Sequence, residues 1–286
     1  MKKIAAVERM KAAAGEIKTQ GRILGFVPTM GYLHEGHLSL VRESLKKADA
    51  TVVSIFVNPL QFGPREDFRR YPRDPERDEA LLEEAGVDIL FHPADLDMVP
   101  DGFRTTVEVS GLQDKLCGRS RPGHFKGVAT VVLKLFNIVR PDYAFFGQKD
   151  AQQAIILRRM TKDLDLDTKI EIRPIVREED GLALSSRNMY LNPEERRAAL
   201  VLFRSLKKAH AMWAAGEREA GSIRGEMLRL IGSEPLARVD YVEIVDSDTL
   251  ETVDRINGKT LVAVAVLIGN TRLIDNTILG GKGEHP

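Results

Sequence analysis

This sequence has little cysteine and no excess of charge of either sign. Among its 286 residues Cys117 is the single cysteine, which excludes an intrachain disulfide and a zinc site built on cysteines. Lys and Arg together number 42, as do Asp and Glu, so the formal net charge is zero. Non-specific binding of nucleic acid depends on many phosphate contacts from Lys and Arg. The charge balance therefore argues against a broad surface for polyanions, and we expect no nucleic-acid partner.

Long apolar runs and two common nucleotide-binding signatures are absent as well. Residues 1–20 carry a charge every few positions and lack the apolar core of a signal peptide. No stretch reaches the roughly 18–20 apolar residues that a membrane-spanning helix needs. No G-x-G-x-x-G follows the first predicted strand, and there is no Walker A lysine. We therefore expect a cytoplasmic protein without a membrane partner, and the dinucleotide-binding and P-loop interpretations lose their main support.

Strands and helices alternate over the first 180 residues. Apolar positions at 38, 41 and 45 have helical spacing and lie between two strand-like runs, so they predict a βαβ unit. The predicted strands are 22–27, 50–58, 87–93, 142–147 and 168–176, with a further one at 104–109, and the predicted helices are 38–48, 76–86, 127–140 and 150–164. This order predicts an α/β fold, a Rossmann-like parallel sheet with helices on both faces.

The pattern changes after about residue 180. Two helices, 192–216 and 217–232, precede three strand-like runs, and Gly269-Asn270 is a two-residue hairpin signal between the last two. Asn192 and Pro193 suit the first positions of a helix. We therefore predict two domains, 1–180 and 181–286, the second a smaller α+β domain. The tail, residues 280–286, is expected to be disordered.

The stretch "PTMGYLHEGHLSL", residues 28–40, carries the first candidate site. Gly31 and Gly36 mark the change from strand to helix, where unpaired N–H groups suit a phosphate. His34 and His37, three residues apart, share a face of the first helical turn and could hydrogen-bond phosphate oxygens. Zinc is an alternative, but it needs a third ligand, and His-Glu-Gly-His is one residue too short for HExxH. A solvated pair without function is the other alternative.

A second strand-to-helix junction lies in "FFGQKDAQQ", residues 145–153. Lys149 would lie beside a helix N-terminus, which is a poor place for a cation unless an anion binds there too. Gln153 would face the same side one turn later, and Asp150 is a plausible N-cap. The plain alternative for Lys149 is a solvated loop lysine.

Two further loops supply polar side chains. In "LALSSRN" the residues Ser185, Ser186 and Arg187 could clamp a phosphate, although they are also ordinary loop chemistry. In "FVNPLQFG" the neutral amides Asn58 and Gln61 suit a hydroxy acid held by hydrogen bonds. Asp74 and Asp78 could take Mg²⁺ through water, but a solvated helix start is the favoured interpretation of the run in which they lie.

These motifs together resemble a known family. "HEGH" resembles the HIGH motif, and "LSSRN" the KMSKS-type loop, of the nucleotidyltransferase-like adenylating enzymes. The fuller set adds "FVNPLQFGPREDF", "YPR" and "GHFKGVATVVLKLFNIVRPDYAFFGQKDAQQ", and it is similar to the pantothenate synthetase (pantoate–β-alanine ligase) family. The match runs in order along nearly the whole chain and is densest from residue 28 to residue 192.

The resemblance implies a reaction and a set of site residues. ATP and pantoate would give pantoyl adenylate and pyrophosphate, and β-alanine would then displace AMP to give pantothenate. His34, His37 and Lys149 would be catalytic, Gln61, Gln153 and Asn58 would bind pantoate or β-alanine, and the family uses Mg²⁺, for which no protein ligands are assigned, and forms homodimers. The implied ATP-binding residues are Met30, Gly31, Tyr32, Leu33, His34, Glu35, Gly36, His37, Gly147, Gln148, Lys149, Asp150, Val176, Leu184, Ser185, Ser186 and Arg187.

Three other functions fit parts of the pattern. A nucleotidyltransferase acting on a phosphate-bearing acceptor would need more positive charge where this chain has the amides Asn58, Gln61 and Gln153. An aminoacyl-tRNA synthetase shares the HIGH and KMSKS motifs, but this chain is short and has no net charge. An ATP-binding module without catalysis would not require His34 and His37 together with Lys149.

Overall fold

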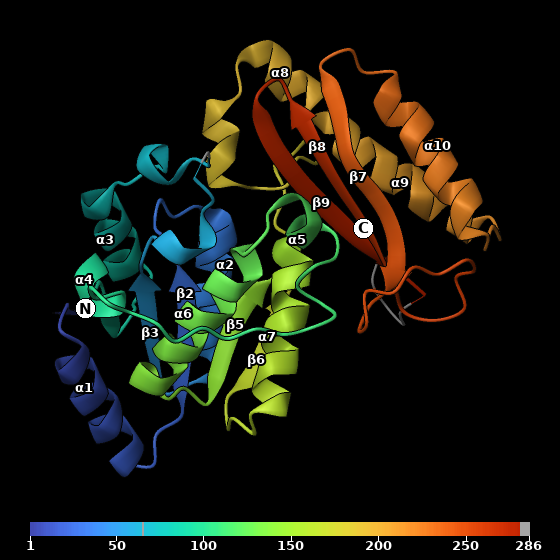
Figure 1. Ribbon diagram of the computed structural model, residues 1–286. Helices are drawn as coiled ribbons and strands as arrows, with labels where there is room; N and C mark the ends of the chain where they lie inside the picture. Colours follow the sequence, from blue (N-terminus) through green and yellow to red (C-terminus); the bar gives the residue numbers. More distant parts are fainter. Residues whose placement is uncertain (65, 281–286) are drawn as a thin grey trace.

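The structure is a computed structural model that describes residues 1–64 and 66–280. The chain forms a larger part around a parallel sheet and a smaller part around an antiparallel sheet (Figure 1). The predicted disorder of the C-terminal tail concerns residues 280–286, and all of these except residue 280 lie outside the described ranges. Within the described ranges no helix has the length and apolar character that a membrane span requires.

The first sheet has six strands in the order β1-β4-β3-β2-β5-β6, and every pairing is parallel. The strands are β1 (Lys2–Ile4), β2 (Leu24–Thr29), β3 (Ala50–Ile55), β4 (Ile89–Phe91), β5 (Tyr143–Gly147) and β6 (Lys169–Arg173). Strand β2 lies between β3 and β5, so the chain runs toward opposite edges of the sheet after β2 and after β5. Ligands bind at the carboxyl ends of the strands at such a switch point.

Helices cover both faces of this sheet, as the sequence predicts (Figure 1). They are α1 (Val7–Thr19), α2 (Glu35–Lys47), α3 (Pro75–Glu84), α4 (Asp95–Met98), α5 (Cys117–Ser120), α6 (His124–Val139) and α7 (Ala151–Asp163). Successive side chains of a strand point to opposite faces. Phe26 of β2 packs in the cluster that contains α1, α6 and α7, and Val27 packs in the cluster that contains α2 and α3.

The second sheet has three antiparallel strands in the order β7-β8-β9. Its elements are α8 (Pro193–Ala198), α9 (Leu200–Ala214), α10 (Ala220–Gly232), β7 (Ala237–Asp246), β8 (Thr260–Ile268) and β9 (Thr271–Leu279). Strand β8 is buried on both faces: Val262 and Val264 pack with α9 and α10, while Leu261 and Ala263 join the core of the larger part. The predicted hairpin at residues 269–270 joins β8 to β9.

Several local features differ from the sequence predictions. Strand β1 and helix α1 were not predicted, because the N-terminal pattern is dominated by exposed charge. The prediction of a strand at 104–109 is wrong, because this described segment forms no strand. The N–H of Val107 bonds instead to Thr130 Oγ1, at 2.9 Å. The helix that begins after the predicted cap Asn192 is divided at Ala199. Asp150 stands at the N-cap of α7, but its side chain makes no capping bond.

Candidate active site

The histidine turn, residues 34–37, lies at the start of α2 and is held by the histidine rings themselves. His34 is the N-cap, and its Nδ1 accepts a hydrogen bond from the N–H of Gly36 at 3.1 Å. His37 Nδ1 accepts one from the N–H of His34 at 3.3 Å, and the ring centroids are 4.0 Å apart. Because each Nδ1 is an acceptor, each neutral ring carries its proton on Nε2. The turn thus offers two Nε2–H donors.

Both imidazoles of this turn are neutral at pH 7. Burial, with the nearby ammonium of Lys149, lowers the pKa of His34 to about 4. Burial, with His34 and Lys149, lowers the pKa of His37 well below its usual value. An anion at this turn would therefore meet hydrogen-bond donors and the Lys149 charge, and its own charge would favour protonation of the rings.

Asp78 fixes the loop that leads into the histidine turn, and the sequence interpretation of this residue as part of a solvated helix start is wrong. Its side chain is buried, and its two oxygens accept the N–H groups of Tyr32 at 2.6 Å and Leu33 at 2.7 Å. These bonds support a loop in which Gly31 and Tyr32 have positive φ values of 81° and 50°. Because main-chain donors occupy both oxygens, the Mg²⁺ alternative finds no support at Asp78. A signal was present, since Asp78 shares a face of α3 with the buried Leu82.

Lys149 lies at the carboxyl end of β5, beside the histidine turn. It sits in the 3₁₀ turn η3 (Gln148–Asp150), with 21% of its side chain exposed. Its nearest carboxylate is that of Asp150, and the closest N–O distance is 3.8 Å, which is long for an ion pair. The C-terminal strand β9 also reaches this turn, because Asn276 Nδ2 donates to the carbonyls of Gln148 at 2.9 Å and Lys149 at 3.1 Å.

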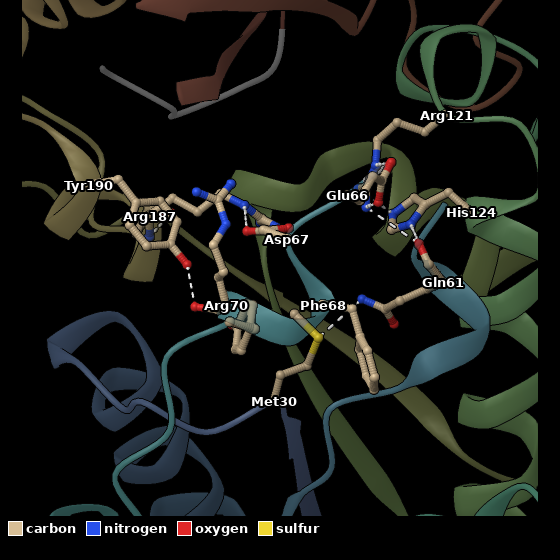
Figure 2. A network of polar contacts seen from close by, with 12 residues as sticks. Met30, Gln61, Glu66, Asp67, Phe68, Arg70, Arg121, His124, Arg187 and Tyr190 are labelled. Carbon is tan, nitrogen blue, oxygen red and sulfur yellow. Dashed lines mark hydrogen bonds and ion pairs between the residues drawn. The ribbon is translucent and has the colours of Figure 1, made fainter. Parts of the chain in front are cut away.

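The two predicted amides after β3 lie together. Asn58 Nδ2 donates to Gln61 Oε1 at 3.1 Å and to the carbonyl of Gly127 on α6 at 3.0 Å. Its Oδ1 accepts the N–H of Leu60 at 3.0 Å, so the buried Asn58 side chain is fully engaged within the protein. Gln61 Nε2 lies 3.1 Å from Met30 Sδ, which brings this turn next to the loop after β2 (Figure 2).

Two carboxylates that sequence reasoning missed lie in the acid loop, residues 66–70. Asp67 accepts a two-pronged contact from Arg187, with distances of 3.0 Å to Nε and 2.9 Å to Nη2 (Figure 2). Although burial works against it, the Arg187 guanidinium holds the pKa of Asp67 below its usual value. Tyr190 adds a hydrogen bond of 3.0 Å to the carbonyl of Arg70. The acid loop is thus tied to the segment that contains the predicted phosphate clamp, residues 185–187.

Glu66 makes the matching contact with Arg121. The distances are 2.8 Å from Nε to Oε1 and 2.6 Å from Nη2 to Oε2 (Figure 2). Arg121 Nη1 also lies 3.0 Å from His124 Nε2, and His124 Nδ1 lies 2.8 Å from the carbonyl of Gln61. Burial, with the charge of Arg121, lowers the pKa of His124 to about 4. This chain of contacts fixes the backbone of Gln61.

Other predicted ATP-binding positions make contacts within the protein. The segment 184–187 touches the loop after β2, because Ser186 Oγ donates to the carbonyl of Tyr32 at 3.4 Å. Leu184 N–H bonds to the carbonyl of Val176 at 3.0 Å, which places these two residues side by side. Glu35 belongs to the histidine turn, but its carboxylate pairs with Arg42 farther along α2.

A cavity of about 700 Å³ joins several of these groups. The predicted site residues in its lining are Lys149, Asp150, Gln153, Ser185 and Arg187. It is also lined by Glu66, Asp67, Arg121, Tyr241, Arg272 and Asn276, which the sequence did not single out. The volume lies within the range of small-molecule sites. The two histidines of the turn, Gln61 and Met30 do not line it, but the contacts described above connect them to its wall.

The fold and the site together define an α/β nucleotide-binding enzyme, with anion-suited turns at the switch point of a parallel sheet. The family profile described as pantoate-beta-alanine ligase matches residues 2–278. The chain belongs to the pantoate–β-alanine ligase family, which confirms the resemblance seen in the motifs. It is an ATP-dependent ligase that condenses pantoate with β-alanine to give pantothenate, AMP and pyrophosphate.

Individual relatives agree over nearly the full length. A pantothenate synthetase of Pelotomaculum thermopropionicum is 59% identical over 274 residues, 96% of this chain and 97% of the relative. That of Thermotoga petrophila is 58% identical over 280 residues, 98% of this chain and 100% of the relative.

Solved structures confirm the fold. A pantothenate synthetase crystal structure from Thermus thermophilus has a TM-score of 0.91 at 45% identity, covering 97% of this chain and 99% of that one. A pantoate-beta-alanine ligase from Francisella tularensis, complexed with beta-gamma ATP and beta-alanine, has a TM-score of 0.82 at 34% identity and covers 97% of both chains.

Proposed function

We propose that this chain makes pantothenate in two half-reactions at the site described above, with the predicted residues in defined roles. The histidine turn and Lys149 bind the phosphates of ATP, and they stabilise the charge that develops when the pantoate carboxylate attacks the α-phosphate. The supporting observation is that both imidazoles carry their proton on Nε2 and lie near the Lys149 ammonium. Preorganised donors of this kind act most strongly where charge develops in the transition state.

The loop 184–187 supplies the second set of phosphate contacts. Ser185 and Arg187 line the cavity, and Ser186 touches the loop after β2, so the three residues lie where a triphosphate extending from the histidine turn would pass. Arg187 gives a planar guanidinium suited to two phosphate oxygens. The Nε and Nη2 edge of the guanidinium now bonds to Asp67, so a phosphate that binds this edge displaces that carboxylate.

The neutral amides hold the acid substrate. Gln61 and Gln153 bind pantoate through its hydroxyl and carboxylate groups, and Gln61 lies close to the β-alanine position. Asn58 supports this binding by holding the amide of Gln61, since its own polar atoms are already bonded within the protein. The backbone contacts from His124 and Arg121 fix Gln61 from the other side.

The donor set suits Mg²⁺ bound together with ATP. Mg²⁺ keeps several waters and uses one or two carboxylates plus substrate phosphates. Asp150 is such a carboxylate: it is half-exposed, it lines the cavity beside Lys149, and its side chain caps no helix. When bound, the ion would neutralise phosphate charge, and Asp150 would hold it through water or directly.

Several organisational features belong to the same proposal. The boundary between domains 1–180 and 181–286, a homodimer and a cytoplasmic location rest on the sequence pattern and the family resemblance. The stretch 177–190, together with the C-terminal domain, acts as a lid that keeps water from the pantoyl adenylate, a reactive anhydride. Equal hydrogen exchange of 177–190 with and without ATP plus pantoate would count against the lid.

Isotope exchange between pyrophosphate and ATP tests the first half-reaction. We expect exchange with pantoate and Mg²⁺ present and β-alanine absent, because the adenylate forms before the amine is needed. The matched control omits pantoate. Absence of exchange in folded, ATP-binding protein that still makes AMP and pantothenate from all three substrates would overturn the proposed order of half-reactions.

A further inference from the structure

Asn276 is a buried amide whose side-chain polar atoms all contact the turn that carries Lys149. It is 3% exposed and lies on β9, 127 residues from Lys149 in the sequence. Its Nδ2 donates to the carbonyls of Gln148 and Lys149, at 2.9 and 3.1 Å. Its Oδ1 accepts from Gln148 Nε2 at 3.3 Å. A buried amide with all its partners in one short turn is specific to the geometry of that turn.

These two carbonyls belong to the two peptide groups on either side of the Lys149 Cα. The orientation of both peptide planes sets the direction in which the Cα–Cβ bond leaves the backbone. Asn276 therefore constrains the direction of the Lys149 side chain, although it lies in a different sheet. Among the described residues its ammonium makes only the long contact to Asp150, so the backbone is the main constraint on the Lys149 side chain.

The strand that presents Asn276 is firmly anchored. The preceding residue, Asp275, is 3% exposed and pairs with Arg177, at 2.7 Å to Nη1 and 3.0 Å to Nη2. Arg177 Nη1 also donates to the carbonyl of Gly181 at 3.1 Å, within the short hairpin that leads to Ser185. The same stretch of β9 thus contacts the turn that carries Lys149 and, through Arg177, the hairpin that leads to Ser185.

We infer that Asn276 is a positioning residue for the adenylation step, acting on ATP through the backbone of Lys149. This inference rests on the proposed role of Lys149. It makes the C-terminal sheet part of the ATP site through the backbone of the turn that carries Lys149.

The test is a double-mutant cycle on ATP affinity. Dissociation constants for ATP with Mg²⁺ are measured calorimetrically for the full chain and for Asn276→Ala, Lys149→Ala and the double variant. We expect Asn276→Ala to weaken ATP binding about tenfold in the parent, the size of a lost buried hydrogen bond. In the Lys149→Ala background the same change should have almost no effect, because its route of action is gone.

Two more variants separate positioning from packing. Asn276→Asp keeps the shape and removes both donors, so it should weaken ATP binding at least as much as Asn276→Ala. Thr277→Val is the matched control: it changes a buried polar side chain on the opposite face of β9, and it should leave ATP affinity unchanged. Melting temperatures of all variants show whether each protein is folded.

The outcomes distinguish a failure of the role inferred for Asn276 from a failure of the role proposed for Lys149. Unchanged affinity in Asn276→Ala, or the same weakening in both backgrounds, would overturn the inference and leave the role of Lys149 intact. Unchanged affinity in Lys149→Ala would instead remove the proposed phosphate contact of Lys149, and the inference with it.

Discussion

The histidine turn and the acid loop are held in place by different kinds of contact. In the histidine turn the rings of His34 and His37 accept main-chain N–H groups, and both rings are neutral. In the acid loop Glu66 and Asp67 pair with the charged side chains of Arg121 and Arg187. The first set of contacts uses the Nδ1 atoms and, among the described residues, leaves the Nε2–H donors to a ligand, while the second set occupies the Nε and Nη2 donors of each arginine.

This difference separates a preformed part of the site from an exchangeable one. At the histidine turn the main-chain bonds to the rings use the Nδ1 atoms, so a phosphate on Nε2–H breaks none of them. A phosphate on the Nε and Nη2 edge of Arg187 replaces Asp67, and part of the gain is offset by the lost ion pair. Substitutions confined to one of these two parts test the difference between them.

Loss of Lys149 should have the largest effect. Within residues 1–64 and 66–280 its ammonium makes only a long contact to Asp150, so it is the cation of the proposed site most available to ATP. Lys149→Ala should reduce pantoate-dependent pyrophosphate exchange about 10³-fold, since one preorganised charge contributes up to about 4 kcal/mol in the transition state. Circular dichroism checks that the fold is intact. Normal turnover in the folded variant would remove Lys149 from the mechanism.

Loss of His37 should be nearly as severe. We expect His37→Ala to lower kcat by about 10²–10³-fold with a small change in KM, because the Nε2–H contact tightens as charge develops. Steady-state kinetics with varied ATP separates the two constants. An effect confined to KM would mean that His37 acts in ground-state binding and not on the transition state.

Asp67→Asn tests the exchangeable side. Removing the carboxylate charge weakens the competitor for Arg187, so KM for ATP should fall about threefold, a difference of well under 1 kcal/mol. Glu66→Gln is the matched control, because it changes the neighbouring residue, which pairs with Arg121 instead. A rise in KM in Asp67→Asn would show that the pair holds Arg187 ready for ATP and does not compete with it.

The pH dependence is the mildest test, and it addresses the neutral state of the histidines. In the folded protein the pKa of His34 is about 4, below the value near 6.5 of an unfolded chain. The unfolded state therefore binds more protons between these values, so stability is full above about pH 6.5 and falls as the pH drops toward 4. His34→Asn should make the melting temperature less dependent on pH over this window, and the remaining dependence should come from His37 and His124, whose pKa values are also lowered.

Activity should not follow the same curve. Since neutral imidazoles are the donors, the exchange rate should be level from about pH 7 to 8.5. A rate that declines through this range as the pH rises would indicate that a protonated imidazole is required, and the two parts of the site would then be more alike than the structure indicates.

Much of the fold was predictable from local pattern. The strand runs of the larger part and their helices repeat at short range, and each glycine-marked junction at the carboxyl end of a strand carries a candidate site. The motifs at residues 34–37 and 147–153 were found in this way, and β2 and β5 place them side by side.

The residues that the sequence analysis missed, or in the case of Asp78 misinterpreted, have partners far away in the sequence. Asp78 bonds to a loop 45 and 46 residues earlier, Asp67 to a residue 120 positions later, and Asn276 to a turn more than 120 positions earlier. Nothing near these residues in the sequence specifies such partners, because they are set by how strands and loops meet in three dimensions. Asp74, by contrast, is the predicted kind of helix start, since it caps α3 with a local bond to Arg77.

The close approach of α6 to the turn that contains Gln61 limits one distant position. A methyl group at Gly127 would lie 2.2 Å from the carbonyl oxygen of Leu60, so even alanine would push the turn outward. That shift would carry Gln61 and its amide with it, and displacements near 1 Å in an oriented site reduce rates about 10²-fold. The absence of a single carbon atom on a helix of the main core thus decides where the turn with Gln61, the proposed pantoate-binding amide, can lie.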